Sequence, residues 1–372
     1  MDILIVSNHF YPQSTPRAFR TTELAKELAK QGHLVTVIVP KDEEIHHEFE
    51  QKYNVKIEDL GSLRWHEIQP NGNKIVKFGK LVLKRISEQF LYYPQIQLKC
   101  LVKKALKKHK EKEYDALISI AAPHPIHWGV ADAIKDGMKP AKKWIADCGD
   151  PFMLSGNIHY NRPFYFKYLE KKFCRLADAI TVPFEGAKEG YYKEFGEKLH
   201  VIPQGFNFTE FPEIKNKQNE HEVPTFAYAG SLNLKRRNPS QLLDYLLKKR
   251  VPFKFYLYTN NILLVQEYAN DYPDKVILRG YKPRAELLEE LSEMDFVLNF
   301  ENQGSTQLPS KLIDYAILEK PILSIKFDDL DTELVDQFLN GNYSNSISMG
   351  DVDEYRIESV TDKFISLIES GK

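Results

Sequence analysis

The sequence predicts an α/β protein made of two doubly wound domains that face each other. Short apolar segments alternate with segments in which apolar residues recur at helical spacing, which is the order found in parallel-sheet domains. The alternation stops in the polar stretch 204–223 and then starts again, so this stretch is interpreted as an interdomain linker. The length of 372 residues suits two domains at roughly 150 residues each.

The first half opens with a strand, a helix and a second strand. The strand Ile3–Ser7 is short and apolar, and the helix Arg17–Gln31 stops at Gly32. The next strand, Leu34–Val39, ends at Pro40. Such a βαβ unit normally pairs its strands in parallel. The alternation continues with strands at Ala116–Ile120, Lys143–Ala146, Ala179–Pro183 and His200–Pro203, and with helices at Ile126–Ile134, Tyr165–Leu176 and Glu185–Phe195.

After the linker the same order predicts a second parallel sheet. Its strands are expected at Thr225–Ala229, Phe253–Tyr258, Lys275–Leu278, Phe296–Phe300 and Pro321–Ile325, and its helices at Gln241–Lys249, Arg284–Glu293 and Lys311–Leu318. Ligands of doubly wound sheets bind at the carboxyl ends of the strands, so a cleft between the domains is the expected site.

The chain ends in a predicted helix, Ile357–Glu369, with an apolar stripe that must be buried against another part of the protein. The stripe consists of Ile357, Val360, Phe364 and Leu367.

The composition is that of a globular protein with almost no net charge. The formal net charge of −1 argues against attraction of the whole surface to nucleic acid. The three cysteines, Cys100, Cys148 and Cys174, follow no zinc-binding spacing and suit reduced thiols in the cytoplasm. The sequence contains neither a membrane-spanning apolar run nor the pattern of a signal peptide.

One segment departs from the alternation because basic residues dominate it. From Lys99 to Lys110, lysines lie beside a helical stripe of apolar residues. The simplest interpretation is a solvated basic face. An anionic membrane surface or a phosphate-bearing acceptor is the sharper alternative. Nucleic acid is a third interpretation, which no recognition motif supports.

A strand-to-helix loop in the second half has the pattern of an anion site. The stretch TFAYAGSLNLKRRNPSQLL runs from a strand into Gly230 and Ser231, and it places Arg237 and other cations before a helix that begins near Pro239. Glycine, cations and the backbone N–H groups of a helix start together favour a bound anion. A solvated run of charges is the alternative.

A second loop, in NQGSTQLPSKLIDY, strengthens the prediction of an anion site in this domain. It contains Ser305 and Thr306, and a helix begins after it. Because the helix dipole disfavours a cation in the first turn, Lys311 suggests a bound anion nearby. Asp314, on the same helix, is placed to accept hydrogen bonds from a ribose.

Five segments in this order resemble glycosyltransferase family 4. They are ILIVSNHFYPQSTPRAFRTTELAKELAKQGHLVTVIVP, WIADCGDPF, ADAITVPFEGAKEGYYKEFGEKLHVIPQGFN, FAYAGSL and PSKLIDYAILEKPILS. The resemblance implies the GT-B fold, in which two Rossmann-like domains face each other and the last helix crosses back to the first. It implies an acceptor-side domain at 1–205, joined by 355–372, and a nucleotide-sugar-binding domain at 206–354.

The resemblance also implies transfer of a sugar from a nucleotide-sugar with retention of configuration and without a metal or other cofactor. Arg237 lies where the family often has a Lys, and Lys311 fits the members that read PSKL. Ser231 replaces an Arg that often follows the glycine. Many members carry a pair of Glu residues. The first maps onto Thr306 and the second onto Asp314. The replacement by Thr306 loses the charge and concerns the identity of the donor sugar.

In the first domain the loop NHFYPQSTPRAFR stands where the family usually has a glycine-rich loop. Ser14 and Thr15 can present hydroxyl and N–H groups near the helix start, and Arg17 can contact a phosphate or an acceptor anion. His9 and His124 are further acceptor-side candidates, although an isolated imidazole is more often a solvated or core residue.

Two carboxylates in WIADCGDPF complete the candidates. Asp147 and Asp150 follow a predicted strand and suit contact with the acceptor hydroxyl or with positive charge on the sugar, so they join Arg237 and Lys311 as catalytic candidates; loop capping is the alternative. The pair Asp329 and Asp331 matches a metal-binding pattern but more simply caps the next helix.

These patterns lead to one interpretation and two alternatives. The interpretation is a retaining, nucleotide-sugar-dependent glycosyltransferase of bacterial surface-polysaccharide synthesis, with a glycan or lipid-linked acceptor and no nucleic-acid partner. We expect it in the cytoplasm, with the inner membrane face as an alternative place of action. The alternatives are a sugar-nucleotide epimerase of the same fold and a non-catalytic nucleotide-binding or assembly subunit. Two departures from the family favour the non-catalytic subunit: the glycine-rich loop is missing, and Thr306 stands in place of a Glu.

Overall fold

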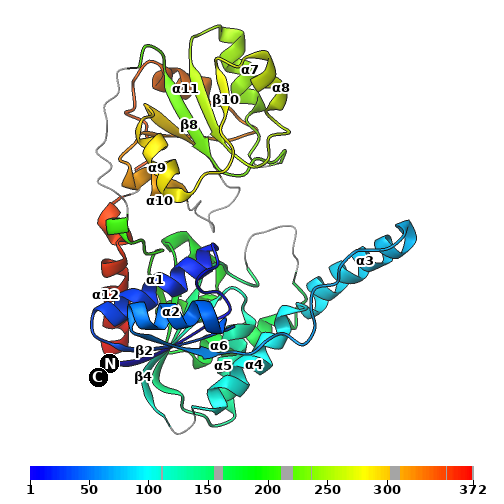
Figure 1. Ribbon diagram of the computed structural model, residues 1–372, viewed down its shortest axis with the longest axis vertical. Helices are drawn as coiled ribbons and strands as arrows, with labels where there is room; N and C mark the ends of the chain where they lie inside the picture. The colour runs from blue at the N-terminus through cyan, green and yellow to red at the C-terminus, as the bar shows by residue number, and fades with distance from the viewer. Residues whose placement is uncertain are drawn as a thin grey trace. The chain divides into compact units, whose positions relative to one another are not determined.

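The computed structural model describes residues 1–109, 112–154, 162–210, 221–235, 237–301, 311–348 and 350–370. Contacts divide the chain into two units: the first is formed by Met1–Asn207 with Glu354–Lys372, and the second by Phe208–Asp353. Each unit is a parallel sheet with helices on both faces (Figure 1). The predicted pair of doubly wound α/β domains is therefore confirmed.

The first unit is built on a seven-stranded parallel sheet in the order β3-β2-β1-β4-β5-β6-β7. Its strands are β1 (Asp2–Ser7), β2 (Leu34–Val39), β3 (Val55–Asp59), β4 (Tyr114–Ala121), β5 (Ala141–Cys148), β6 (Ala179–Val182) and β7 (Leu199–Val201). The chain moves outward from β1 to β3 and then returns to β4 on the other side of β1. The loops after β1 and β4 therefore flank the point where the winding reverses.

Two layers of helices cover this sheet, because alternate residues of each strand point to opposite faces. Leu4 and Val6 of β1 pack with one layer, and Ile3 and Ile5 pack with the other. The first layer holds α4 (Leu98–Lys107), α5 (Pro125–Lys135) and α6 (Phe166–Leu176), and the second holds α1 (Pro16–Lys30), α2 (Glu43–Tyr53) and α12 (Ile357–Glu369). One further helix, α3 (Lys74–Leu91), projects away from the sheet (Figure 1).

The C-terminal helix α12 belongs to the first unit, as the sequence analysis predicts. Phe206 pairs with Arg356 in a parallel bridge just before α12 begins. Close approach requires glycine at position 205, because a Cβ there would lie 2.7 Å from the Ile357 side chain. Four residues of α12 are buried in the core beneath α1: Ile357, Val360, Phe364 and Ile368. Leu367, expected in the buried stripe, is only partly buried.

The second unit is built on a five-stranded parallel sheet in the order β10-β9-β8-β11-β12. Its strands are β8 (Thr225–Ala229), β9 (Lys254–Tyr258), β10 (Val276–Leu278), β11 (Phe296–Phe300) and β12 (Ile322–Ile325). One face packs against α7 (Ser240–Lys249), α8 (Gln266–Asp271) and α11 (Thr332–Leu339), and the other against α9 (Arg284–Ser292) and α10 (Lys311–Ile317). Here the winding reverses between β8 and β11.

The helix predicted over 185–195 is wrong. Two short 3-10 segments, Glu185–Gly190 and Lys193–Lys198, stand there instead. The chain is extended at Tyr191, and Gly190 lies so close to Pro151 that a Cβ would meet its ring at 2.1 Å. Packing on Pro151 therefore overrides the helical spacing of the apolar residues. The elements between 43 and 91 and the helix α8 have no counterpart in the sequence prediction, and α11 was expected only as the helix that follows Asp331.

Candidate functional site

In the second unit the loop after β8 is held against the strand by Tyr228. Gly230 has room for no side chain here, because a Cβ would lie 2.7 Å from the Tyr228 hydroxyl. That hydroxyl donates a hydrogen bond to the carbonyl of Ser231 over 3.1 Å. Ser231 itself is exposed. The backbone thus passes closely over the end of the sheet at the winding reversal, where a ligand can approach N–H groups.

Arg237 is fixed in the same loop by its backbone. Its N–H and carbonyl pair with Asn233, each over 3.1 Å. The side chain is half-buried and lies beside Tyr228. Burial raises the pKa of Tyr228, and the charge of Arg237 and a hydrogen bond from it oppose this rise. Arg237 therefore places a fixed positive charge at the carboxyl edge of the second sheet.

Helix α10 brings Asp314 and Tyr315 to the same edge. The Tyr315 hydroxyl accepts a hydrogen bond from the N–H of Ala229 at the end of β8, over 3.0 Å. Burial raises the pKa of Tyr315, and the charge of Arg237 opposes the rise. Asp314 is 4% exposed, and its Oδ1 accepts a hydrogen bond of 2.9 Å from Arg284 Nε on α9.

The structure thus brings together three of the donor-side candidates, Gly230, Arg237 and Asp314. Lys311 begins α10, but its side chain lies outside the described residues, as do Ser305 and Thr306. Sequence reasoning missed Arg284, the ion-pair partner of Asp314. No local motif marks Arg284, and only the packing of α9 against α10 shows the pair.

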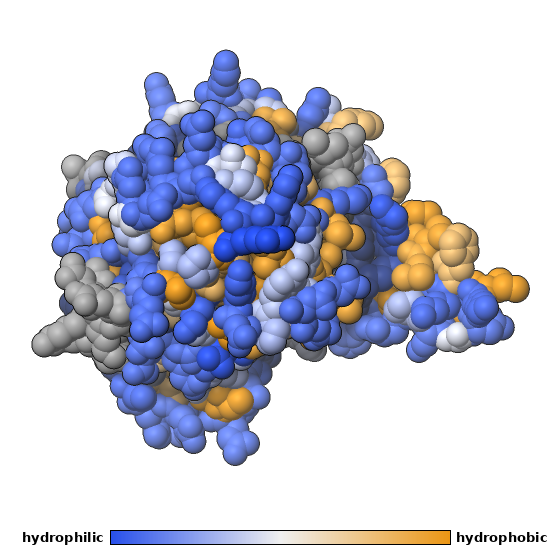
Figure 2. All heavy atoms as spheres, turned by 90° about the horizontal axis from the view of Figure 1, so that it is seen from above, coloured by the Kyte–Doolittle hydropathy of each residue, from blue (hydrophilic) through white to orange (hydrophobic). Residues whose placement is uncertain are grey.

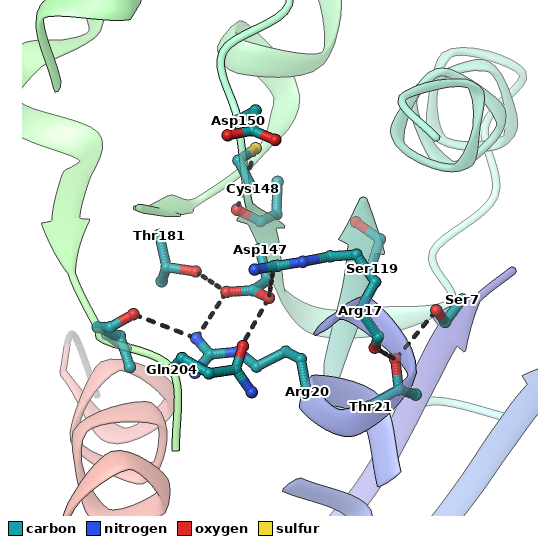
Figure 3. Close-up of polar contacts among 12 residues, drawn as sticks. Ser7, Arg17, Arg20, Thr21, Ser119, Asp147, Cys148, Asp150, Thr181 and Gln204 are labelled. Atoms are coloured by element: carbon teal, nitrogen blue, oxygen red, sulfur yellow. Dashed lines mark hydrogen bonds and ion pairs between the residues drawn. The ribbon is translucent and has the colours of Figure 1, made fainter. Parts of the chain in front are cut away.

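In the first unit Asp147 is the centre of a buried ion pair (Figure 3). It lies at the end of β5 with 1% exposure. Arg20 of α1 donates to both carboxylate oxygens, from Nε over 3.1 Å and from Nη2 over 2.8 Å. Thr181 donates to Oδ1 over 2.6 Å. Burial alone would raise the pKa of Asp147, but the charges and hydrogen bonds of Arg20, Arg17 and Thr181 hold it below its ordinary value.

Arg20 also connects the carboxyl end of the sheet to the segment before the linker. It donates to the backbone carbonyls of Pro203 and Ile202 over 2.5 and 3.3 Å, and its guanidinium lies 5.0 Å from the Phe364 ring of α12. Asp147 is thereby engaged in holding α1, β5 and α12 together. This arrangement favours a positioning role for Asp147 over contact with an acceptor. Arg20, which sequence reasoning missed, is recognisable as a charge among the buried positions of α1.

Arg17 is the cation of this edge that remains partly accessible. Its Nη1 lies 3.5 Å from Asp147 Oδ2, and its side chain is 19% exposed. Glycine at position 149 makes room for it, because a Cβ there would lie 2.7 Å from Arg17 Cζ. Burial and the neighbouring Arg20 lower the pKa of Arg17, although Asp147 opposes the shift.

His124 and Asp150 meet beside this edge. His124, just before α5, is buried, and its Nε2 donates to the Asp150 carbonyl over 3.0 Å. Burial lowers the pKa of His124 to about 4, so the ring is neutral at pH 7. Its Nδ1 has no hydrogen-bond partner among the described residues. Asp150 lies beyond Cys148, away from the Arg20–Asp147 pair (Figure 3).

The remaining acceptor-side candidates lie in the loop after β1. His9 Nδ1 lies 2.8 Å from the side-chain oxygen of Gln13 on the exposed surface. Thr15 caps α1 by accepting from the N–H of Ala18 over 3.2 Å, and Ser14 is exposed. Thr15 therefore stabilises the start of α1, while His9 and Ser14 lie on the accessible surface of the loop.

The basic stripe from Lys99 to Lys110 is partly neutralised within the first unit. Lys99 pairs with Asp132 over 2.9 Å, and Lys103 pairs with Asp136. The apolar side of α4 is buried in the core, and Lys110 lies outside the described residues. The described part of α4 thus behaves as an ordinary amphipathic helix of the domain.

The described residues contain neither a metal site nor a membrane-spanning helix. No group of three or more His, Cys, Asp or Glu side chains among them is arranged to hold a metal ion. Asp331 caps α11 by accepting from the N–H of Leu334 over 3.0 Å, as the sequence suggests. Within the described part of the chain, no helix is long and apolar enough to cross a membrane.

Comparison with known proteins decides the family. A family model described as Glycosyltransferase Family 4 matches residues 19–210. The chain belongs to glycosyltransferase family 4. The resemblance noted from the five sequence segments is thus confirmed, and the chain is a glycosyltransferase. No curated protein matches this family 4 chain significantly in sequence.

Solved structures share the GT-B fold of this family 4 enzyme. A glycosyltransferase from Rickettsia africae is 13% identical, with a TM-score of 0.60 over 100% of this chain and 99% of that one. HepE from Anabaena, solved in complex with UDP and glucose, is 12% identical, with a TM-score of 0.60 over the whole of both chains. TarM is 11% identical, with a TM-score of 0.59 over 99% of each chain. At these identities the likeness shows the fold.

Proposed function

We propose that this enzyme transfers a sugar from a UDP-sugar, with retention of anomeric configuration, to a glycan or lipid-linked acceptor in bacterial surface-polysaccharide synthesis. The convergence of Arg237 with α10 at the winding reversal of the second sheet carries the donor assignment. UDP is the nucleotide chosen because HepE, which is similar in fold, was solved in complex with it. The family resemblance implies retention and a reaction without metal. The enzyme would act in the cytoplasm, at the inner membrane face when the acceptor is lipid-linked.

In this proposal Arg237 stabilises the charge that develops on the leaving diphosphate. A guanidinium held in place before the reaction needs no reorganisation as the negative charge grows. Lys311, Ser305 and Thr306 are assigned to the same diphosphate and sugar by the family pattern alone. Asp314 is assigned to the ribose, and Arg284 would position its carboxylate.

The carboxyl edge of the first sheet is assigned to the acceptor. Arg17 offers a partly accessible guanidinium, which suits an acceptor that carries phosphate. Asp150 lies at the same edge and would contact the attacking hydroxyl or the sugar, and the buried His124 would position it through the hydrogen bond to its carbonyl. Asp147 acts as a positioning residue, because Arg20 and Thr181 already occupy its carboxylate.

Calorimetric titration with UDP tests the donor assignment. Arg237→Ala should weaken binding by roughly 1.5–3 kcal/mol, the scale of a hydrogen bond to a charged group. Lys235→Ala is the matched control, since Lys235 is an exposed cation of the same loop. Its affinity should stay within about twofold of the unchanged protein. Equal affinities for UDP in all three proteins would contradict the assignment.

Turnover distinguishes the alternatives. An active transferase should release UDP from a UDP-sugar, and the anomeric configuration of the product can be read by NMR. UDP binding without hydrolysis or transfer would support a non-catalytic subunit. Interconversion of UDP-sugars without an acceptor would indicate an epimerase.

A further inference from the structure

Helix α3 leaves the first unit as an amphipathic helix with little contact to the rest of it. The helix begins at Lys74, where Asn73 caps it by accepting from the N–H of Val76 over 3.0 Å. It runs for 18 residues to Leu91 and projects from the body of the unit (Figure 1). Among its residues only Ser87 is buried. The position of α3 is thus not explained by burial within the described chain.

One face of α3 is apolar and exposed. Side chains three to four positions apart share one side of a helix. Ile75, Phe78, Val82 and Ile86 follow this spacing with exposures of 84%, 69%, 41% and 50%. Figure 2 shows apolar residues gathered on the projecting part of the molecule. A contiguous apolar surface of this kind marks an interaction site.

Cations surround the apolar face of α3. The helix carries five of them against one carboxylate, Glu88. By helical spacing Lys77, Lys80 and Lys84 lie opposite the apolar face, and Lys74 and Arg85 border it. Lys77 and Arg85 are exposed, while Lys84 pairs with Glu67. An apolar face backed by lysine and arginine is the pattern of helices that lie in the interface of an anionic membrane.

Exposed aromatic residues continue this surface at the base of α3. The Tyr165 hydroxyl donates to the backbone carbonyl of Phe90, so the start of α6 lies against the end of α3. Phe164 and Tyr168, beside this contact, are 71% and 60% exposed. Aromatic rings concentrate at the boundary between lipid and water because they combine an apolar body with polar edges.

We propose that α3 docks the enzyme on an anionic lipid bilayer. Its apolar face enters the boundary between headgroups and acyl chains, and its cations lie among anionic headgroups. Charge complementarity selects this occupant over a second copy of the chain, because Lys74 and Arg85 border the apolar face and would be joined by the same two cations of the partner if two such faces packed together. The proposal differs from the earlier membrane hypothesis for the stripe Lys99–Lys110, and it does not depend on the identity of donor or acceptor.

Vesicle co-sedimentation of the full chain tests the proposal. The vesicles are neutral phosphatidylcholine, or the same lipid with 30% phosphatidylglycerol. The first variant, Ile75→Glu/Phe78→Glu, adds two charges to the apolar face. Its control is Leu263→Glu/Tyr281→Glu, which makes the same charge change at side chains of the second unit that are equally exposed, at 85% and 73%.

A second pair of variants tests whether cations are needed for binding and whether the cations of α3 or those of α4 are responsible. Lys77→Gln/Arg85→Gln removes two cations from α3, and Lys104→Gln/Lys107→Gln removes two exposed cations from α4. The α3 pair should lower the partition coefficient on anionic vesicles by roughly 30-fold, and the α4 pair by much less. Far-UV circular dichroism and UDP titration check that each variant is folded.

Binding to anionic vesicles that is lost only in the two α3 variants supports the proposal. Equal binding of all proteins, or no binding of the wild type to anionic vesicles, overturns it. Light scattering provides a further test: a wild-type dimer that Ile75→Glu/Phe78→Glu converts to a monomer would assign this face to a second copy. A normal UDP affinity alongside absent vesicle binding would refute the docking proposal while leaving the donor assignment intact.

Discussion

Substituting Arg20 should lower the unfolding free energy of the first unit far more than substituting a surface cation. The guanidinium is buried and gives two hydrogen bonds to the Asp147 carboxylate and two to backbone carbonyls. In Arg20→Ala the Asp147 carboxylate stays buried, with Thr181 and the more distant Arg17 as its remaining partners. Breaking a buried pair by removing one partner costs about 3–5 kcal/mol.

The cost should depend on pH in a defined direction. In the wild type the folded-state pKa of Asp147 lies below its unfolded value. This stabilisation is present above the unfolded pKa, near 3.9, and is lost as pH falls through the folded pKa. Without Arg20, burial raises the pKa of Asp147. Protonation of Asp147 at acid pH then removes the buried charge and stabilises the folded variant. The difference in unfolding free energy between wild type and Arg20→Ala should therefore shrink from pH 7 to pH 5.

Tryptophan fluorescence makes the measurement specific for the first unit. The protein has three tryptophans, Trp65, Trp128 and Trp144, and all lie in residues 1–207. Urea titrations followed by this signal report unfolding of that unit without a contribution from tryptophans of the second.

Two further variants complete the design. Arg20→Lys keeps the charge but lacks the forked donors, so it should recover only part of the loss. In a double-mutant cycle with Asp147→Asn, the two substitutions should be strongly non-additive. A cost below about 1 kcal/mol for Arg20→Ala, or a cost that does not change with pH, would refute the reasoning.

Three other outcomes are expected. Phe364→Ala should cost about 3–5 kcal/mol in the tryptophan-detected transition, because α12 is part of the first core; an unchanged midpoint would show that the helix is dispensable. Burial raises the pKa of Glu170 to about 7, so the wild type should lose about 3 kcal/mol of stability as pH rises from the unfolded pKa near 4.5 through 7. Glu170→Gln should abolish that loss. If the stability of both proteins changed with pH in the same way, Glu170 would not be its cause. Transfer activity should survive treatment with EDTA, whereas inactivation that added Mg²⁺ or Mn²⁺ reverses would establish a metal requirement.

The order of strands and helices could be predicted because hydrophobic periodicity is a local property. The strands Leu34–Val39, Thr225–Ala229 and Phe296–Phe300 and the helix Ile357–Glu369 have the bounds expected from sequence. The region from 43 to 91 could not be assigned in the same way. There β3 is a short edge strand, and α3 has an apolar face that no core of the described chain covers.

The candidate site was accessible from sequence only where a residue's role follows from its place in a loop. Gly230 and Arg237 were predicted in this way, because glycine and a cation at a strand end suggest an anion site. Arg20 and Arg284 were not found, since each acts through a partner that is distant in sequence. Asp147 was predicted as a catalytic candidate, and its pairing with Arg20 could not be seen from WIADCGDPF alone.

The sequence by itself determined the fold class and the family, because these depend on periodicity and on local motifs. Only the tertiary structure decided how the charges are used. It places Asp147 against Arg20, binds Lys99 and Lys103 to acidic residues, and leaves the two faces of α3 exposed. The physical reason is that the burial and pairing of a charge depend on residues far away in the chain, whose proximity is fixed only when the sheet is assembled.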